Sequence, residues 1–194
     1  MGIDSKLYQN LSRFIEVVVI CGICWFLSIF IFMLPLAVLC YCFLMSNIME
    51  DKKLFCFPKI TKNKVLKLLA IIGFGYPLLY TISQLSLMES FWISFLMTAF
   101  LVSFYAITCM IALNYENKIM DTIRIAFYYT IANFHKSGFP IFLFLLGIRI
   151  LNGILFVYVV IVIAVTGSYF LYKVNYFGLE KLKFLNKNVS GGSE

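Results

Sequence analysis

Four long stretches of this sequence contain no charged residue, and they restrict the possible folds more than any other feature. They are Val17–Met49, Leu68–Met88, Ser90–Tyr115 and Ile150–Tyr172. A helix needs about 20 apolar residues to cross the hydrocarbon core of a bilayer, which is about 30 Å thick. The last three stretches each have the length of one crossing. With 62% hydrophobic and 13% charged residues, the chain is unlike a soluble domain, and we predict an all-α, polytopic integral membrane helical bundle.

The first stretch, Val17–Met49, is too long for one ordinary crossing. At about 1.5 Å per residue it would form a helix of roughly 50 Å. Pro35 lies near its middle, where proline removes a backbone donor and disrupts a helix. One kinked, over-long helix would give the bundle five crossings, whereas a hairpin at Pro35 would give it six.

A second region, residues 137–172, is also longer than one crossing and is interrupted only by Arg149. Its strongest turn signal is the dipeptide Asn152-Gly153, because both residue types tolerate positive φ. Gly138 and Pro140 suit the start of a helix. We therefore expect a hairpin here, with a short first arm.

The lysines orient the chain, because short cytoplasmic loops are rich in Lys and Arg. Six lysines lie in Glu50–Lys67 and four follow Tyr172, which predicts that this loop and the C-terminus are both cytoplasmic. Glu89 would then mark a short external turn. A hairpin at Pro35 also places the N-terminus inside, so that every basic residue except Arg149 faces the cytoplasm; a single crossing would leave the N-terminus outside. The hairpin is favoured because it makes the asymmetry of basic residues between the two sides of the membrane more complete.

The segment 118–134 has the pattern of an amphipathic helix on the inner membrane surface. Its apolar residues recur at helical spacing: Ile119, Met120, Ile123, Phe127, Ile131 and Phe134. It is either an interfacial connector or a docking helix for a partner protein, in which case Phe127 and Ile131 would make the contact.

These elements predict one membrane-embedded helical domain over residues 1–189. Its membrane stretches are 17–49, 68–88, 90–115 and 137–172, and 118–134 is its interfacial helix. Residues 190–194, with the sequence Ser-Gly-Gly-Ser-Glu, are typical of a flexible linker.

The sequence predicts no catalytic residue, no cofactor and no metal site. Cys21 and Cys24 form a C-x-x-C pair, but a zinc site needs a second pair or matching histidines, so the cysteines are expected to pack as small apolar residues. The one histidine, His135, has no catalytic partner that the sequence identifies. The aromatic residues lie mostly inside the uncharged stretches and not on a basic face, which argues against nucleic-acid binding.

Polar residues inside the membrane are better functional candidates, because exposing them to lipid is costly. Arg149 is the foremost. It lies about 18 Å along a helix that starts near Ser137, toward the outer leaflet, where it can pair with Glu89, reach lipid phosphates, or contact a substrate or partner. Gln84 and Asn114 can form hydrogen bonds between helices.

This layout resembles the YesL-like family of small bacterial polytopic membrane proteins. The features that carry the resemblance are Ser5-Lys6-Leu7-Tyr8 before an apolar helix, Trp25 followed by Pro35, the inner loop Phe55–Lys67, and Asn114-Tyr115 before the helix with Ala126. The resemblance implies a bacterial cell membrane location and a context of carbohydrate uptake, since such proteins are often encoded beside sugar transporters.

Two functions follow as hypotheses. The first is a non-enzymatic accessory subunit in the lipid bilayer that binds permease subunits or a sensor complex, for example of a carbohydrate ABC transporter. The alternative is a small transporter or channel, alone or as an oligomer. The partner or structural candidates are Arg149, Glu89, Asn152, Phe127 and Ile131.

Overall fold

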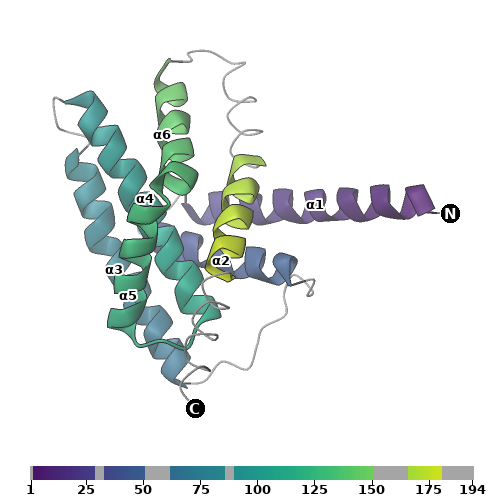
Figure 1. Cartoon of the computed structure of the whole chain (residues 1–194), viewed down its shortest axis with the longest axis horizontal. Coiled ribbons are helices and arrows are strands. Elements are labelled where there is room, and N and C mark those ends of the chain that lie inside the picture. The colour runs from purple at the N-terminus through teal and green to yellow at the C-terminus, as the bar shows by residue number, and fades with distance from the viewer. Residues whose placement is uncertain (1, 29–32, 51–61, 86–89, 151–165, 181–194) are drawn as a thin grey trace.

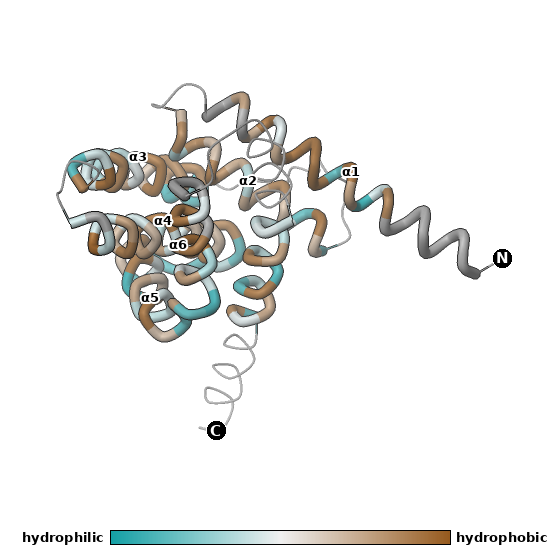
Figure 2. Tube along the Cα trace, turned by 90° about the horizontal axis from the view of Figure 1, so that it is seen from above, coloured by the Kyte–Doolittle hydropathy of each residue, from teal (hydrophilic) through white to brown (hydrophobic). Residues whose placement is uncertain are grey.

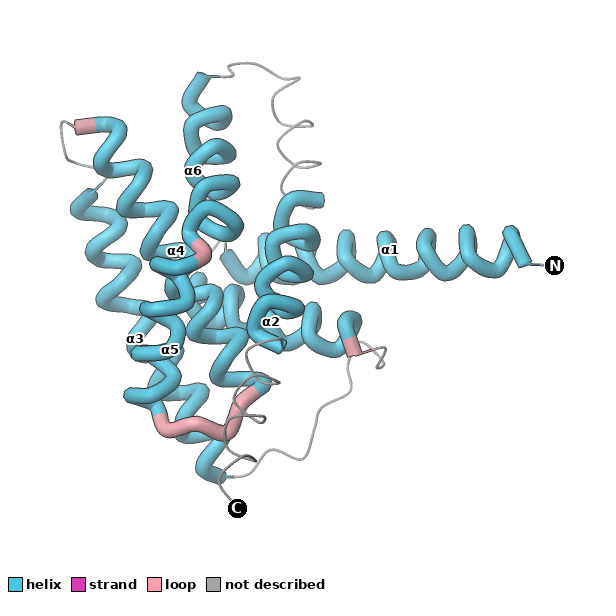
Figure 3. Tube along the Cα trace, viewed as in Figure 1, coloured by secondary structure: helices cyan, strands magenta, loops and turns pink. Residues whose placement is uncertain are grey.

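The structure, a computed structural model, describes residues 2–28, 33–50, 62–85, 90–150 and 166–180, and all of its regular elements there are helices (Figure 3). In chain order they are α1 (Gly2–Ser28), α2 (Leu34–Met49), α3 (Lys62–Leu85), α4 (Phe91–Asn114), α5 (Ile119–Ala132) and α6 (Phe134–Ile150). Residues 166–180 form a further helix. The all-α prediction is confirmed for these residues.

The helix α4 is the centre of the bundle. It packs against α2, α3, α5 and α6, and these neighbours cover its second half, where the sequence is almost entirely apolar. The fully buried side chains there include Ile107, Cys109, Met110, Ile111 and Ala112.

The helices α3, α4 and α6 run side by side, whereas α1 lies across them and projects from the bundle (Figure 1). Figure 2 shows the same arrangement from above, with α3, α4 and α6 seen nearly along their axes. The core contact of α1 is with α2, through Val17, Ile20 and Cys24. The exposed surface of α1 remains apolar, since Phe14, Val18 and Val19 all lie outside.

The first uncharged stretch forms two helices, so a single over-long helix is wrong. The chain leaves α1 at Ser28 and enters α2 at Leu34, and the two helices pack against each other. Pro35 lies in the first turn of α2, where its missing N–H would have had no helical partner. It therefore starts a helix and does not kink one.

Within the described residues, two helices are long and apolar enough to cross a membrane: α3, and α4 over Trp92–Asn114. The five or six crossings predicted from the charge pattern are not shown. With 16 residues, α2 reaches about 24 Å, less than the hydrocarbon thickness, and α1 lies across α3 and α4.

Two predicted boundaries also differ. The chain turns at Asn133, between α5 and α6, so the predicted helix 118–134 is shorter than expected. Gly138 and Pro140 lie inside α6 and not at its start. The main-chain carbonyl of Asn133 accepts hydrogen bonds from the amides of Lys136 and Ser137, and α6 therefore begins directly after it.

One glycine sets how closely the helices approach. A Cβ atom at Gly75 of α3 would lie 2.7 Å from the Cβ of Pro35 in α2 and 2.8 Å from the ring of Tyr105 in α4. Only glycine lets the three helices meet at this point.

Candidate functional site

The predicted pair of Arg149 and Glu89 falls partly outside the described residues. Arg149 lies in the last turn of α6, next to Ile150, and the structure does not describe its side chain. Glu89 and Asn152 lie outside the described residues. The ion pair and the turn at Asn152 therefore remain predictions.

The predicted partner surface on α5 lies on the outside of the bundle. Ile131 is 53% exposed and Phe127 is 42% exposed, while the buried side of α5 is made of Thr122, Ala126, Tyr129 and Thr130. The two threonine hydroxyls donate to main-chain carbonyls four residues earlier, Lys118 and Ala126. Apart from Tyr129, the side chains that face inward are small, while large apolar ones such as Ile131 face outward. A helix on a water-soluble protein buries its large apolar side chains instead.

Phe127 has a second role that the spacing alone did not indicate. Its ring makes edge contacts with Phe100 and Phe104 of α4, at centroid distances of 6.1 and 6.0 Å. It therefore holds α5 on α4. Ile131 and Met120, which is 75% exposed, are better probes of an external contact.

Polar side chains join the helices at one end of the bundle. Ser46 of α2 donates to Oδ1 of Asn114, at 2.9 Å, which confirms the prediction that Asn114 bonds between helices. The ammonium of Lys67 in α3 donates to the carbonyl of Tyr115, also at 2.9 Å. Gln84, the other residue named for this role, is exposed. We call Ser46, Lys67, Asn114 and Tyr115 the polar end.

Two tyrosine hydroxyls near the polar end have raised pKa values. Burial, and then the nearby Glu180, raises the pKa of Tyr115, whose hydroxyl donates to the carbonyl of Leu179 at 2.9 Å. Burial, followed by the carboxylates of Glu50 and Glu180, raises the pKa of Tyr176 to about 12. Both groups are therefore neutral donors at physiological pH, and their role is to hold helices together.

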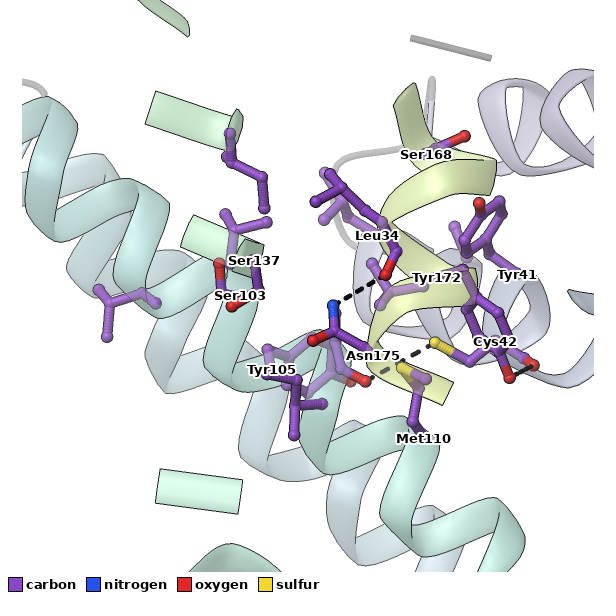
Figure 4. Close-up of a pocket in the computed structure, with 18 of the residues that line it drawn as sticks. Leu34, Tyr41, Cys42, Ser103, Tyr105, Met110, Ser137, Ser168, Tyr172 and Asn175 are labelled. Atoms are coloured by element: carbon purple, nitrogen blue, oxygen red, sulfur yellow. Dashed lines mark hydrogen bonds between the residues drawn. The ribbon is translucent and has the colours of Figure 1, made fainter. Parts of the chain in front are cut away.

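A cavity of about 590 Å³ lies between α2, α3, α4, α6 and the helix 166–180, and Cys24 of α1 also lines it. Figure 4 shows its polar residues against the surrounding helices. The wall is mostly aliphatic and aromatic, and no charged side chain is among the described residues that line it. Its apolar members include Leu79, Ile82, Leu101, Ile141, Phe170 and Leu171.

Most polar side chains of the cavity wall donate their hydrogens to main-chain carbonyls. The hydroxyl of Tyr105 points to the carbonyls of Pro35 and Ile71, at 3.2 and 3.4 Å. Ser103 and Ser137 bond to carbonyls four residues back in the chain. Two further hydrogen bonds join different helices. The hydroxyl of Tyr172 donates to the carbonyl of Cys42, and the thiol of Cys42 donates to the carbonyl of Ala106.

Asn175 is the exception. The residue is 6% exposed, and its Nδ2 donates to the carbonyl of Leu171 at 2.9 Å. Its Oδ1 is buried and accepts no hydrogen bond. Among the described side chains, one other buried N or O atom has no hydrogen-bond partner, the hydroxyl of Tyr41, which lies near Ser168. Asn175 and Tyr41 both line the cavity. Sequence reasoning missed Asn175, although it is a polar residue only three positions beyond the last uncharged stretch.

The cysteines occupy packing positions. Cys24, Cys42 and Cys109 are buried, and each of the five described cysteines is a free thiol. Within the described parts of the chain, no three His, Cys, Asp or Glu side chains come together in a way that could hold a metal ion.

Comparison with known proteins finds no match for this chain among protein-family models, curated proteins or solved structures. The resemblance to the YesL-like family therefore remains a prediction that rests on the motifs quoted above.

Proposed function

We propose that this protein is an integral membrane protein that performs no catalysis and binds, as an accessory subunit, to a permease or sensor complex, for example of a carbohydrate ABC transporter. The observation that carries the proposal is the outward apolar surface of α5. Its buried side holds Tyr129 and three small residues, and large apolar side chains such as Met120 and Ile131 are exposed and therefore available to lipid or to another protein.

The membrane location is supported by α3 as well. Leu66, Leu69 and Tyr80 are 69%, 61% and 67% exposed, and large apolar side chains in such number on one helix need a non-aqueous surrounding. In this proposal α3 and α4 supply two of the crossings that the charge pattern predicts. The lysines place the polar end and the C-terminus at the cytoplasmic side of a bacterial cell membrane.

A small transporter or channel is the alternative function. A polar cavity would favour it, because a hydrophilic solute or ion needs polar groups along its path. The described part of the cavity wall is instead apolar and without charged side chains, and most of its polar groups are bonded to the protein itself. The accessory role is therefore the better-supported of the two.

The test compares two outward apolar surfaces. Met120→Ala with Ile131→Ala truncates the exposed face of α5, and Leu66→Ala with Leu69→Ala truncates an equally exposed face of α3. The protein is extracted in mild detergent from its native membrane, and the permease subunits that copurify are quantified. We expect the α5 variant to lose most of the copurifying permease and the α3 variant to keep it, because docking depends on particular side chains.

Two results would contradict the proposal. One is an equal effect of both variants, which would mean that only total apolar area matters. The other is a protein that migrates alone after gentle extraction and carries a solute across liposome membranes. The second result would establish the transporter in its place.

A further inference from the structure

We propose that the cavity between α2, α3, α4, α6 and the helix 166–180 binds a neutral, mainly apolar molecule with one hydroxyl group, which donates a hydrogen bond to Oδ1 of Asn175. The inference does not depend on a permease partner. It rests on the size of the cavity, the chemistry of its wall and the state of one buried amide.

The size and wall of the cavity suit a lipid-like molecule. A volume of about 590 Å³ is in the usual range of small-molecule sites, which is about 300–1,000 Å³. Leu79, Ile82 and Leu101 from two helices, with Ile141 and Phe170 from two others, form continuous apolar wall. Such a surface gains free energy when it covers hydrocarbon.

The orientation of the Asn175 amide is determined by its partner. Nδ2 lies 2.9 Å from the carbonyl oxygen of Leu171, and a carbonyl can only accept a hydrogen bond. The nitrogen must therefore face Leu171, so the oxygen faces the other way. Figure 4 shows this oxygen on the side of the helix 166–180 that faces Ser103, Ser137 and Tyr105, whereas Tyr41 lies on the opposite side.

No described side chain of the wall on that side supplies the missing donor. The hydroxyls of Ser103, Ser137 and Tyr105 each donate to a main-chain carbonyl. A buried acceptor without a donor is costly and rare in native proteins. A ligand hydroxyl would complete the site.

The same arrangement selects the class of ligand. An acceptor without a neighbouring cation does not hold a carboxylate or phosphate, because both are acceptors themselves and carry charge into an apolar site. An ether or an ester has no hydrogen to donate. An alcohol supplies the hydrogen and remains neutral.

The experiment uses the full-length protein in nanodiscs of phosphatidylcholine, a lipid that has no hydroxyl donor. Tritiated farnesol is the probe, and farnesyl methyl ether, of nearly the same shape but without the hydrogen, is the competitor. We expect farnesol to bind about tenfold more tightly than the ether, which corresponds to one hydrogen bond of about 1.4 kcal/mol. Dioleoylglycerol is a second competitor, and its success or failure in displacing farnesol distinguishes a membrane lipid from a smaller free alcohol as the natural source.

Two variants locate the binding, and a third is the control. Asn175→Leu should abolish the preference for the alcohol and leave ether binding unchanged, whereas Asn63→Leu, an exposed asparagine on α3, should preserve the preference. Leu79→Trp should weaken both ligands, because it fills the cavity.

Equal affinity of the unmodified protein for farnesol and its ether would overturn the proposal, and this comparison needs no variant to fold. Binding that Leu79→Trp leaves unchanged would also overturn it, because the ligand would then lie outside the cavity. Farnesoic acid that binds at pH 8 as tightly as farnesol would show that the site does not select neutral molecules.

Discussion

The two described helices that can cross a membrane, α3 and α4, are alike in length and both strongly apolar, but their surroundings are very different. In the most apolar part of α4, 56% of the residues are buried, whereas in α3 the share is 17%. The helix α4 has neighbours on several sides, while α3 meets the bundle along a narrow strip that includes Lys67, Ile71 and Gly75. Apolar character alone therefore shows which helices can enter a bilayer, but it does not show which of them forms the core.

The largest effect that tests this comparison is expected in the core of α4. Ile107→Ala removes a side chain that is 1% exposed, and we expect it to lower the free energy of unfolding by about 2–5 kcal/mol, because it leaves a cavity among packed neighbours. The measurement is unfolding in mixed detergent micelles, followed by circular dichroism.

Ile93→Ala is the matched control on the same helix. Ile93 is 52% exposed, and its truncation should change the free energy of unfolding by about 0.5 kcal/mol or less. If both substitutions had the same effect, α4 would not be the central helix.

A smaller effect is expected where α3 meets its neighbours. Gly75→Ala places a methyl group against Pro35 and Tyr105, and overpacking of this kind costs about 1–3 kcal/mol. Gly73→Ala, two residues earlier, meets nothing within 4 Å and should be neutral or slightly stabilising, since alanine favours a helix more than glycine. A stable Gly75→Ala variant would show that α3 is not held this close to α2 and α4.

The bond that ties the start of α3 to the end of α4 should contribute less. Lys67→Met keeps the length of the side chain and removes its hydrogen bond to the carbonyl of Tyr115. We expect a loss of about 1 kcal/mol, because the cost of burying a charge offsets part of the bond.

Lys64→Met is the control for charge, since it removes one lysine from the same helix at a half-buried position. Thermal unfolding in detergent would compare the two variants. An equal response would assign the effect of Lys67→Met to net charge and not to its hydrogen bond.

The smallest expected effect concerns pH at the polar end. The pKa of Tyr176 is raised from 10.0 to about 12, so the folded state holds the proton more tightly than the unfolded chain. Its contribution to stability is complete below pH 10 and is lost as the pH rises from 10 to 12. In Tyr176→Phe, the free energy of unfolding should fall less steeply between pH 10 and 12. Tyrosinate absorbance of the folded protein should show one fewer group that titrates near pH 12.

The residues whose role could be predicted are those whose property is local. Asn114 was expected to bond between helices because an amide in an apolar stretch needs a partner, and it bonds to Ser46. The spacing of Phe127 predicted that it lies on an outward face. Its contacts with Phe100 and Phe104 of α4 could not be predicted, because they join residues from two helices. Pro35 was expected to interrupt the first stretch, and its missing N–H placed it in the first turn of α2 instead of at a kink.

By itself, the sequence determined the helical class, the positions of the apolar stretches and the break near Pro35, because helix length, hydropathy and proline geometry are properties of neighbouring residues. Only the tertiary structure decided that α4 is central, that α1 lies across the bundle and that Gly75 is a point of close contact. It alone also placed Asn175 at a cavity with Oδ1 lacking a donor, since the wall comes from six helices. Burial depends on which distant segments pack together, and a sum over adjacent residues does not contain that information.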